Sequence, residues 1–196
     1  CCADYSHFPL STDSHKMDAR ISLGIPTDAF VLGYLGSIGR MYLLDRFLHL
    51  FKFAVNARKN CHAMLTTRAT SAFKQLMKAH LTPELSSRVH VKSASRDEVP
   101  VFLPAIDVMV SFILPTYART GASPTKMAEC FASGIPVIAN PGVGDVKQVI
   151  DQLDGGWIVD PFSDTDLMEV VQNLDTICSK GGHRLRDASH SILGLE

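Results

Sequence analysis

Apolar residues in this chain gather in short runs that alternate with helix-like segments. The first clear run covers residues 30–35 and ends at Gly36, and its length and flanks predict a buried strand. Between residues 43 and 58, apolar positions recur at steps of three and four, as on the buried face of an amphipathic helix. The alternation continues, with strands predicted at 63–66, 89–91, 106–110, 135–139 and 157–159, and helices at 70–80, 97–104, 124–133, 145–152 and 164–178.

This order of elements predicts an α/β fold. Short strands that alternate with helices form a parallel sheet with helices on both faces, here a Rossmann-like three-layer α/β/α domain of about six strands at residues 30–178. Residues 1–29 are polar and turn-rich and predict an irregular arm with one short helix near 16–23, while residues 179–196 are predicted to be a tail. The chain starts without Met and ends in Leu-Glu, so we expect an excised domain with a tail that is truncated or carries a cloning scar.

Composition and charge exclude several classes of protein. Of the 196 residues, 46% are hydrophobic and 20% charged, with a formal net charge of -1, which is typical of a soluble domain and not of a nucleic-acid-binding surface. The five cysteines are irregularly spaced and form no Cys-x-x-Cys pair, which indicates neither a zinc site nor a disulfide framework and favours the reducing cytoplasm. No apolar run approaches the roughly 20 residues needed to span a bilayer.

Candidate binding residues follow the predicted strands, because parallel sheets bind ligands beyond the carboxyl ends of their strands. After the first strand, the glycines of segment 36–40 let a backbone approach a ligand, and the following helix start can hold phosphate, although a plain turn explains this segment as well. After the second strand, Thr66, Thr67 and Arg68 offer hydroxyls and a guanidinium to ribose or phosphate, although a solvated loop is also consistent with them.

The segment after the fourth strand carries the densest set of polar groups. Ser123 is predicted to be the N-cap of a helix and Pro124 its first residue. Thr125 and Lys126 then lie in the first turn, where free N–H groups point outward. An ammonium beside those donors suits a diphosphate, since a bound anion would offset the unfavourable position of a lysine at a helix N-terminus.

Glu129 follows Lys126 by one helical turn, among residues that are predicted to be buried. Its carboxylate can accept hydrogen bonds from the vicinal hydroxyls of a ribose, and the alternative is a surface ion pair with Lys126. After the fifth strand, Gly142 and Gly144 permit close approach to a ligand and Asp145 can cap the next helix, although a capped loop alone explains this segment as well.

Together these segments resemble the donor-binding domain of family 4 glycosyltransferases. The resemblance rests on Ser-Pro-Thr-Lys-x-x-Glu at 123–129, Gly-Ile-Pro-Val-Ile-Ala-Asn at 134–140 and Gly-Val-Gly-Asp at 142–145, and it extends over about residues 18–175. Members of this family are retaining, metal-independent enzymes of the GT-B fold, in which two Rossmann-like domains face a cleft. The resemblance implies that this chain is the C-terminal domain, which binds the nucleotide diphosphate sugar.

The resemblance also implies roles for individual residues. The helix start from Ser123 to Lys126 would contact the diphosphate, and Glu129 would hold the ribose. Lys126 and Glu129 are the expected catalytic residues, with Lys126 stabilising the charge on the departing nucleotide diphosphate. No cofactor and no metal ion are expected. The full set of expected donor-binding residues is Gly36, Ser37, Arg40, Thr66, Thr67, Arg68, Ser123, Pro124, Thr125, Lys126, Glu129, Gly142 and Gly144.

The chain departs from the usual family pattern at two places. Many members carry a second glutamate eight positions before the one that matches Glu129, and here that position is Gly121. A subset of the family has Ser-Pro-Thr-Lys instead, and this chain resembles that subset. The family also uses an Arg and a Lys to neutralise the diphosphate, but Arg40 and Lys52 do not match those positions clearly, so we expect Lys126 to take this role.

The expected partners are the nucleotide-sugar donor and an N-terminal acceptor domain, without which the isolated domain should be inactive. No nucleic-acid partner is expected, and the resemblance allows the full-length protein to lie peripherally on the inner face of the membrane. A GT-B nucleotide-sugar epimerase and a non-catalytic nucleotide-sensing domain stay open as alternatives. A Rossmann dehydrogenase is disfavoured, because Arg40 breaks its glycine pattern and threonines end the second strand.

Overall fold

The centre of the molecule is a parallel six-stranded sheet with the order β3-β2-β1-β4-β5-β6. The computed structural model describes residues 2–67, 70–160 and 162–195. Strand order reverses between β1 and β4, which is where doubly wound sheets bind their ligands. The strands are β1 (Phe30–Leu35), β2 (Cys61–Thr66), β3 (Val89–Lys92), β4 (Val108–Ser111), β5 (Val137–Ala139) and β6 (Gly156–Ile158).

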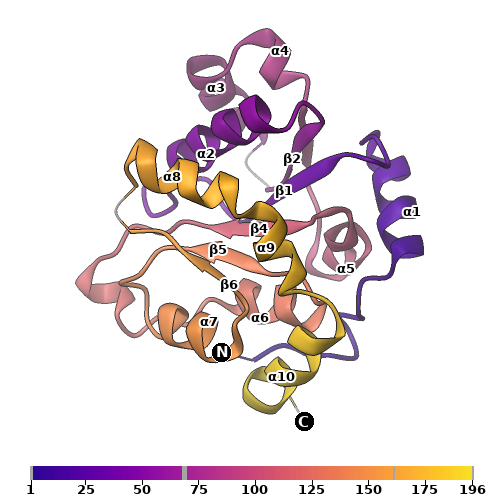
Figure 1. Ribbon diagram of the computed structural model, residues 1–196, viewed down its shortest axis with the longest axis vertical. Coiled ribbons are helices and arrows are strands. Elements are labelled where there is room, and N and C mark those ends of the chain that lie inside the picture. Colours follow the sequence, from indigo (N-terminus) through magenta and orange to yellow (C-terminus); the bar gives the residue numbers. More distant parts are fainter. Residues whose placement is uncertain (1, 68–69, 161, 196) are drawn as a thin grey trace.

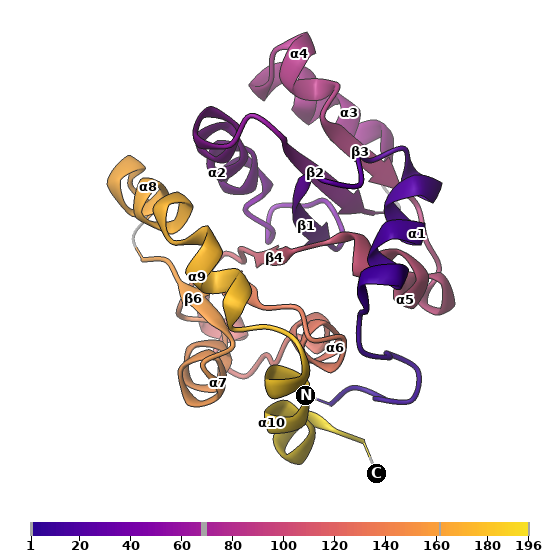
Figure 2. The ribbon, with the colours of Figure 1, turned by 45° about the vertical axis from the view of Figure 1, so that its right-hand side comes forward.

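Helices cover both faces of the sheet, as Figures 1 and 2 show, so the predicted three-layer α/β fold is confirmed. The short helix α4 (Pro83–Ser86), which the sequence did not predict, precedes β3. One face is covered by α2 (Leu44–Ala57), α3 (Thr70–His80), α8 (Asp164–Gln172) and α9 (Leu174–Ser179). The other face is covered by α1 (Asp13–Leu23), α5 (Val99–Phe102), α6 (Thr125–Ala132), α7 (Val146–Leu153) and α10 (His183–Leu193).

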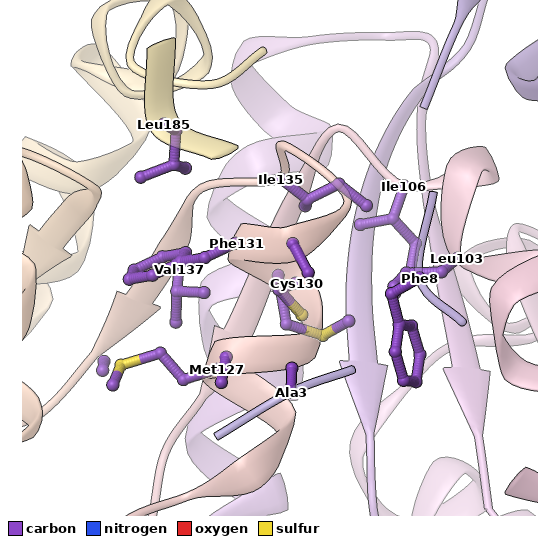
Figure 3. Close-up of a cluster of buried hydrophobic side chains, with 14 of the residues drawn as sticks. Ala3, Phe8, Leu103, Ile106, Met127, Cys130, Phe131, Ile135, Val137 and Leu185 are labelled. Carbon is purple, nitrogen blue, oxygen red and sulfur yellow. The ribbon is translucent and has the colours of Figure 1, made fainter. Parts of the chain in front are cut away.

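Each face of the sheet has its own apolar core. Alternate residues of β1 point to opposite faces, so Val31 belongs to one cluster and Leu32 to the other. Figure 3 shows the first cluster, in which Phe131 of α6 packs among residues from distant parts of the chain. Gly33 marks a close approach within this layer, because a β-carbon there would stand 2.4 Å from Cδ1 of Ile106.

The two terminal segments pack on the domain, which differs from the predicted arm and tail. Phe8 is fully buried, and Ala3 forms a parallel bridge with Gly194, so the two ends of the chain lie side by side (Figure 2). The predicted tail contains α10, whose buried face repeats every four residues at Leu185, Ser189 and Leu193. The guanidinium of Arg186 joins both segments to α6 by donating to the carbonyls of Tyr5, Phe8 and Ala132.

Prolines and caps explain most differences between predicted and observed boundaries. The helix predicted at 97–104 is divided into η1 (Arg96–Glu98), α5 and η2 (Leu103–Ala105), since Pro100 and Pro104 each remove a backbone donor. The helix predicted at 164–178 is two helices that meet at Asn173. Helix α1 begins earlier than expected, because the Thr12 side chain accepts from the His15 N–H. No helix in the described ranges has the length and apolar character needed to cross a membrane.

Candidate functional site

Two neighbouring cavities open at the carboxyl ends of the central strands. The first, of about 170 Å³, lies between the ends of β1 and β4 and the start of α6. The second, of about 270 Å³, lies between the ends of β1 and β2, the loop after β3 and α6. Thr125 and Lys126 line both cavities, so the first turn of α6 stands at their junction.

Lys126 presents its ammonium to this junction without a carboxylate partner. Its Nζ lies 5.2 Å from the ring centroid of Tyr42, within the range of a cation–π contact. None of the ion pairs among the described residues involves Lys126. The alternative interpretation, a surface ion pair between Lys126 and Glu129, is therefore wrong, and the ammonium is available to an anionic ligand.

The start of α6 differs from the prediction in a way that leaves its N–H groups available. Pro124, not Ser123, occupies the N-cap position, and no side chain caps the helix. The Ser123 hydroxyl instead donates to the carboxylate of Asp145 at 3.0 Å. Asp145 stands at the N-cap of α7 but does not cap it with its side chain. An uncapped helix start with N–H groups directed outward is suited to phosphate.

Glu129 lies on the wall of the second cavity and is only 9% exposed. Burial raises the pKa of Glu129, while the nearby charges of Arg96, Lys126 and His7 oppose this increase. Arg96, in η1, lines the same cavity, but the sequence analysis did not select it. Its position directly after β3 was the available signal. The site thus brings a carboxylate and two cations to one cavity, which suits a ligand with both hydroxyl and phosphate groups.

The loop after β1 brings backbone to the junction of the cavities. Gly36 and Ser37 line the second cavity, and the Gly36 N–H donates to the Thr66 carbonyl at 3.0 Å. The hydroxyl of Tyr34 donates to the Ser37 carbonyl at 2.5 Å and fixes the turn. Thr66 and Thr67 are buried and line the same cavity.

Three of the predicted residues, as the structure describes them, do not join this group. Arg40 is exposed and lines neither cavity, and Arg68 lies outside the described residues. Gly142 and Gly144 also line neither cavity and support the loop before α6 instead. Both have a positive φ, and a β-carbon would stand 2.8 Å from Cβ of Pro115 in one case and 1.6 Å from the carbonyl oxygen of Ala122 in the other.

Asn140 is a supporting residue whose role the sequence analysis did not identify. It is buried, and its Oδ1 accepts from the Ile113 N–H at 2.8 Å while its Nδ2 donates to the Ile113 carbonyl at 2.9 Å. This pair of bonds continues the junction between β4 and β5 beyond the ends of both strands. Ile113 lines the first cavity, whereas Asn140 does not, so Asn140 holds a wall residue of the site in place without lining the cavity itself.

Comparison with known proteins shows the family of the chain. The family described as glycosyl transferases group 1 matches residues 29–176. The chain belongs to the group 1 glycosyl transferases. This match covers the whole sheet and every residue that lines the two cavities. No curated protein matches the chain.

Several solved structures share the fold of this group 1 glycosyl transferase chain. Sucrose-phosphate synthase from Thermosynechococcus elongatus is 18% identical with a TM-score of 0.71, over 99% of this chain and 47% of that one. HepE from Anabaena, in complex with UDP and glucose, is 15% identical with a TM-score of 0.74, over 98% and 51%. The C-terminal domain of the group 1 protein LpcC from Francisella tularensis is 16% identical with a TM-score of 0.73, over 99% and 100%.

The chain is shorter than two of these three proteins. It spans about half of sucrose-phosphate synthase and of HepE, and the whole of the LpcC C-terminal domain. The fold is therefore that of one half of a GT-B glycosyltransferase, as the sequence predicted.

Proposed function

We propose that this chain is the donor-binding half of a retaining glycosyltransferase and holds a nucleotide diphosphate sugar across its two joined cavities. The observation that carries the proposal is Lys126, whose ammonium lacks a carboxylate partner among the described ion pairs and stands beside an uncapped helix start. Free N–H groups and an ammonium in one place form a binding site for a diphosphate.

The other lining residues support a position for each remaining part of the donor. Glu129 lies on the second cavity, where its carboxylate accepts hydrogen bonds from ribose hydroxyls, with Thr66 and Thr67 nearby. The nucleoside thus belongs in the second cavity. The first cavity, which shares Thr125 and Lys126 with the second, then receives the sugar. This order places the bond between sugar and diphosphate at the first turn of α6.

The same geometry supplies transition-state stabilisation. When the bond between the anomeric carbon and the diphosphate oxygen breaks, its electron pair stays on the diphosphate. Lys126 and the first-turn N–H groups of α6 then stabilise the increased negative charge. Preorganised donors of this kind are effective because they need no reorganisation during the reaction. The acceptor and the groups that bind it come from the other half of a longer protein.

UDP sugars are the first donors to test, because HepE has been solved with UDP and glucose and with UDP-glucose. Calorimetric titration of the chain with UDP, GDP, ADP and dTDP measures nucleotide selectivity. We expect one of the four to bind selectively. Glu129→Gln should weaken that binding roughly tenfold to a hundredfold, since a hydrogen bond to a charged group contributes about 1.5–3 kcal/mol.

The exposed Glu169 on α8 offers a matched control for this titration. Glu169→Gln removes the same charge on the opposite side of the sheet and should leave nucleotide affinity unchanged. If none of the four nucleotides binds, or if both variants weaken binding equally, the assignment of this site is wrong. Donor binding without sugar transfer by the longer protein would identify a nucleotide-sensing domain instead of an enzyme.

A further inference from the structure

The ring of Tyr42 lies beside Lys126 in the site, and the proposed function gives it no role. Tyr42 comes from the loop between β1 and α2, whereas Lys126 comes from α6, 84 residues later. Both line the first cavity, and the ammonium of Lys126 lies 5.2 Å from the ring centroid. We propose that Tyr42 is a positioning residue, whose ring holds the Lys126 ammonium where it meets the donor diphosphate; this inference rests on the proposed function.

An aromatic partner suits a lysine that must bind an anion. A carboxylate at this place would attract the ammonium more strongly, but it would also repel the incoming diphosphate and compete for the same charge. The face of a tyrosine ring attracts a cation through its quadrupole and carries no net charge. Tyr42 can therefore fix the direction of Lys126 and leave its charge available to the donor.

The ring itself is held in place by contacts that do not need its hydroxyl. Tyr42 forms an antiparallel bridge with Ile113 at the end of β4. Backbone bonds on either side continue this contact, from the Leu43 N–H to the Phe112 carbonyl and from the Leu114 N–H to the Met41 carbonyl. The ring also meets the ring of Tyr34 edge to face, with centroids 6.5 Å apart. Among the hydrogen bonds of the described residues, none uses the Tyr42 hydroxyl.

Gly36 also lies close to the ammonium. A β-carbon on Gly36 would stand 2.8 Å from Nζ of Lys126, so the backbone of this loop and the ring of Tyr42 are both neighbours of the ammonium. Neither neighbour carries a negative charge. The ammonium therefore stays available to an anion at the junction of the cavities, which Lys126 lines together with Thr125.

A double-mutant cycle with UDP tests this role. Tyr42→Leu should weaken UDP binding about threefold to tenfold, the range expected when one partly exposed cation–π contact is lost. Tyr42→Phe keeps the ring and should bind UDP with an affinity close to that of the wild-type chain. In a Lys126→Met background, Tyr42→Leu should cause no further loss, because the ammonium that the ring positions is already absent.

The pair formed by Lys180 and Trp157 provides a matched control. Lys180 Nζ lies 5.8 Å from the centroid of the Trp157 ring. Trp157 belongs to β6 at the edge of the sheet, and neither residue lines the two cavities. Trp157→Leu removes a lysine-facing ring of the same kind and should not change UDP affinity. If Tyr42→Phe loses as much affinity as Tyr42→Leu, or if the loss adds fully to that of Lys126→Met, the positioning role is wrong.

A measurement without ligand separates this inference from the proposed function. The ε-methylene protons of Lys126 should show an upfield NMR shift from the ring current of Tyr42, and Lys126→Met assigns the signal by its disappearance. The shift should persist in Tyr42→Phe and vanish in Tyr42→Leu. Absence of the shift in the wild-type chain overturns the positioning role even if UDP binds. If the upfield shift is present but none of the nucleotides binds, the proposed function is wrong instead.

Discussion

Gly36 and Lys126 share one small space, since a β-carbon on residue 36 would lie only 2.8 Å from the Lys126 ammonium nitrogen. Gly36 begins the loop after β1, and Lys126 lies in the first turn of α6, which follows β4, so their contact crosses the point where strand order reverses. The missing side chain of Gly36 is therefore part of the candidate diphosphate site. Its backbone N–H already donates to the carbonyl of Thr66 at the end of β2, which holds the start of the loop against β2.

Gly36→Ala should weaken binding of the nucleotide diphosphate without a large loss of stability. The new methyl group meets the flexible end of Lys126 at 2.8 Å and, less closely, the Tyr34 hydroxyl at 3.2 Å. The lysine can move, but the displaced ammonium loses part of its contact with the proposed diphosphate. We expect about a tenfold loss of affinity by calorimetry, which corresponds to about 1.4 kcal/mol. Gly39→Ala is the control, because a β-carbon there meets nothing within 4 Å. Equal effects of the two variants would contradict the shared-space argument.

Local patterns in the sequence predict the fold well because each strand and helix carries its own periodicity. The six strands and the helices between them follow from runs such as residues 30–35 and from the apolar steps of α2. Helix α10 was assigned to a tail, since its buried face is formed by only Leu185, Ser189 and Leu193 and is covered by the N-terminal segment. A helix that packs against residues 180 positions away gives a weak local signal.

The site was predictable at the residues that the resemblance carries and not at those set by distant contacts. Lys126, Glu129, Gly36 and the two threonines meet at the cavities, as expected from their positions after the strands. By contrast, Ser123 bonds to Asp145 from the next loop, which no rule of helix capping reveals. Tyr42 and Arg96 reach the cavities from loops whose paths depend on tertiary contacts.

Gly144→Ala should destabilise the domain by about 2 kcal/mol or more. Residue 144 has a φ of 48°, which costs an L-residue with a β-carbon roughly 1–2 kcal/mol, and the new methyl group would collide with the backbone carbonyl of Ala122. Denaturant unfolding of Gly144→Ala and Gly121→Ala gives the comparison, since residue 121 has open space and no positive φ. Similar unfolding midpoints for both variants would show that the two loops are not packed as described.

Asp107→Asn should destabilise the domain by about 3 kcal/mol, because it removes the countercharge of a buried arginine. The Asp107 carboxylate accepts from Lys16, Arg20 and the Val31 N–H, each at 2.7 Å, and Arg20 is only 4% exposed. These bonds attach α1 to the starts of β1 and β4. Asp151→Asn removes the exposed partner of Lys147 and should change the free energy of unfolding by less than about 1 kcal/mol. A loss as small for Asp107→Asn would contradict the proposed importance of this buried cluster.

The affinity for UDP-glucose should decrease as the pH is lowered. This decrease should begin at a higher pH than it would if the binding carboxylate were an exposed glutamate. Burial raises the pKa of Glu129 above its ordinary value of 4.5, against the opposing charges of Arg96, Lys126 and His7. In the proposed site the carboxylate accepts hydrogen bonds from ribose hydroxyls, so the affinity should be complete above this raised pKa and be lost as the pH falls through it. UDP-glucose suits the measurement because its diphosphate diester does not titrate in this range.

Glu129→Gln separates this ionisation from other effects of acid. The amide cannot titrate, so its lower affinity should stay constant across the range in which the wild-type affinity falls. A raised carboxyl pKa also means that the folded state favours the protonated form, so the charge lowers stability once the pH rises through the folded-state pKa. Glu129→Gln should therefore be slightly more stable than the wild-type chain at neutral pH, as measured by thermal unfolding without ligand. A variant that is less stable, or that shows the same pH dependence of binding, would exclude Glu129 as the titrating group.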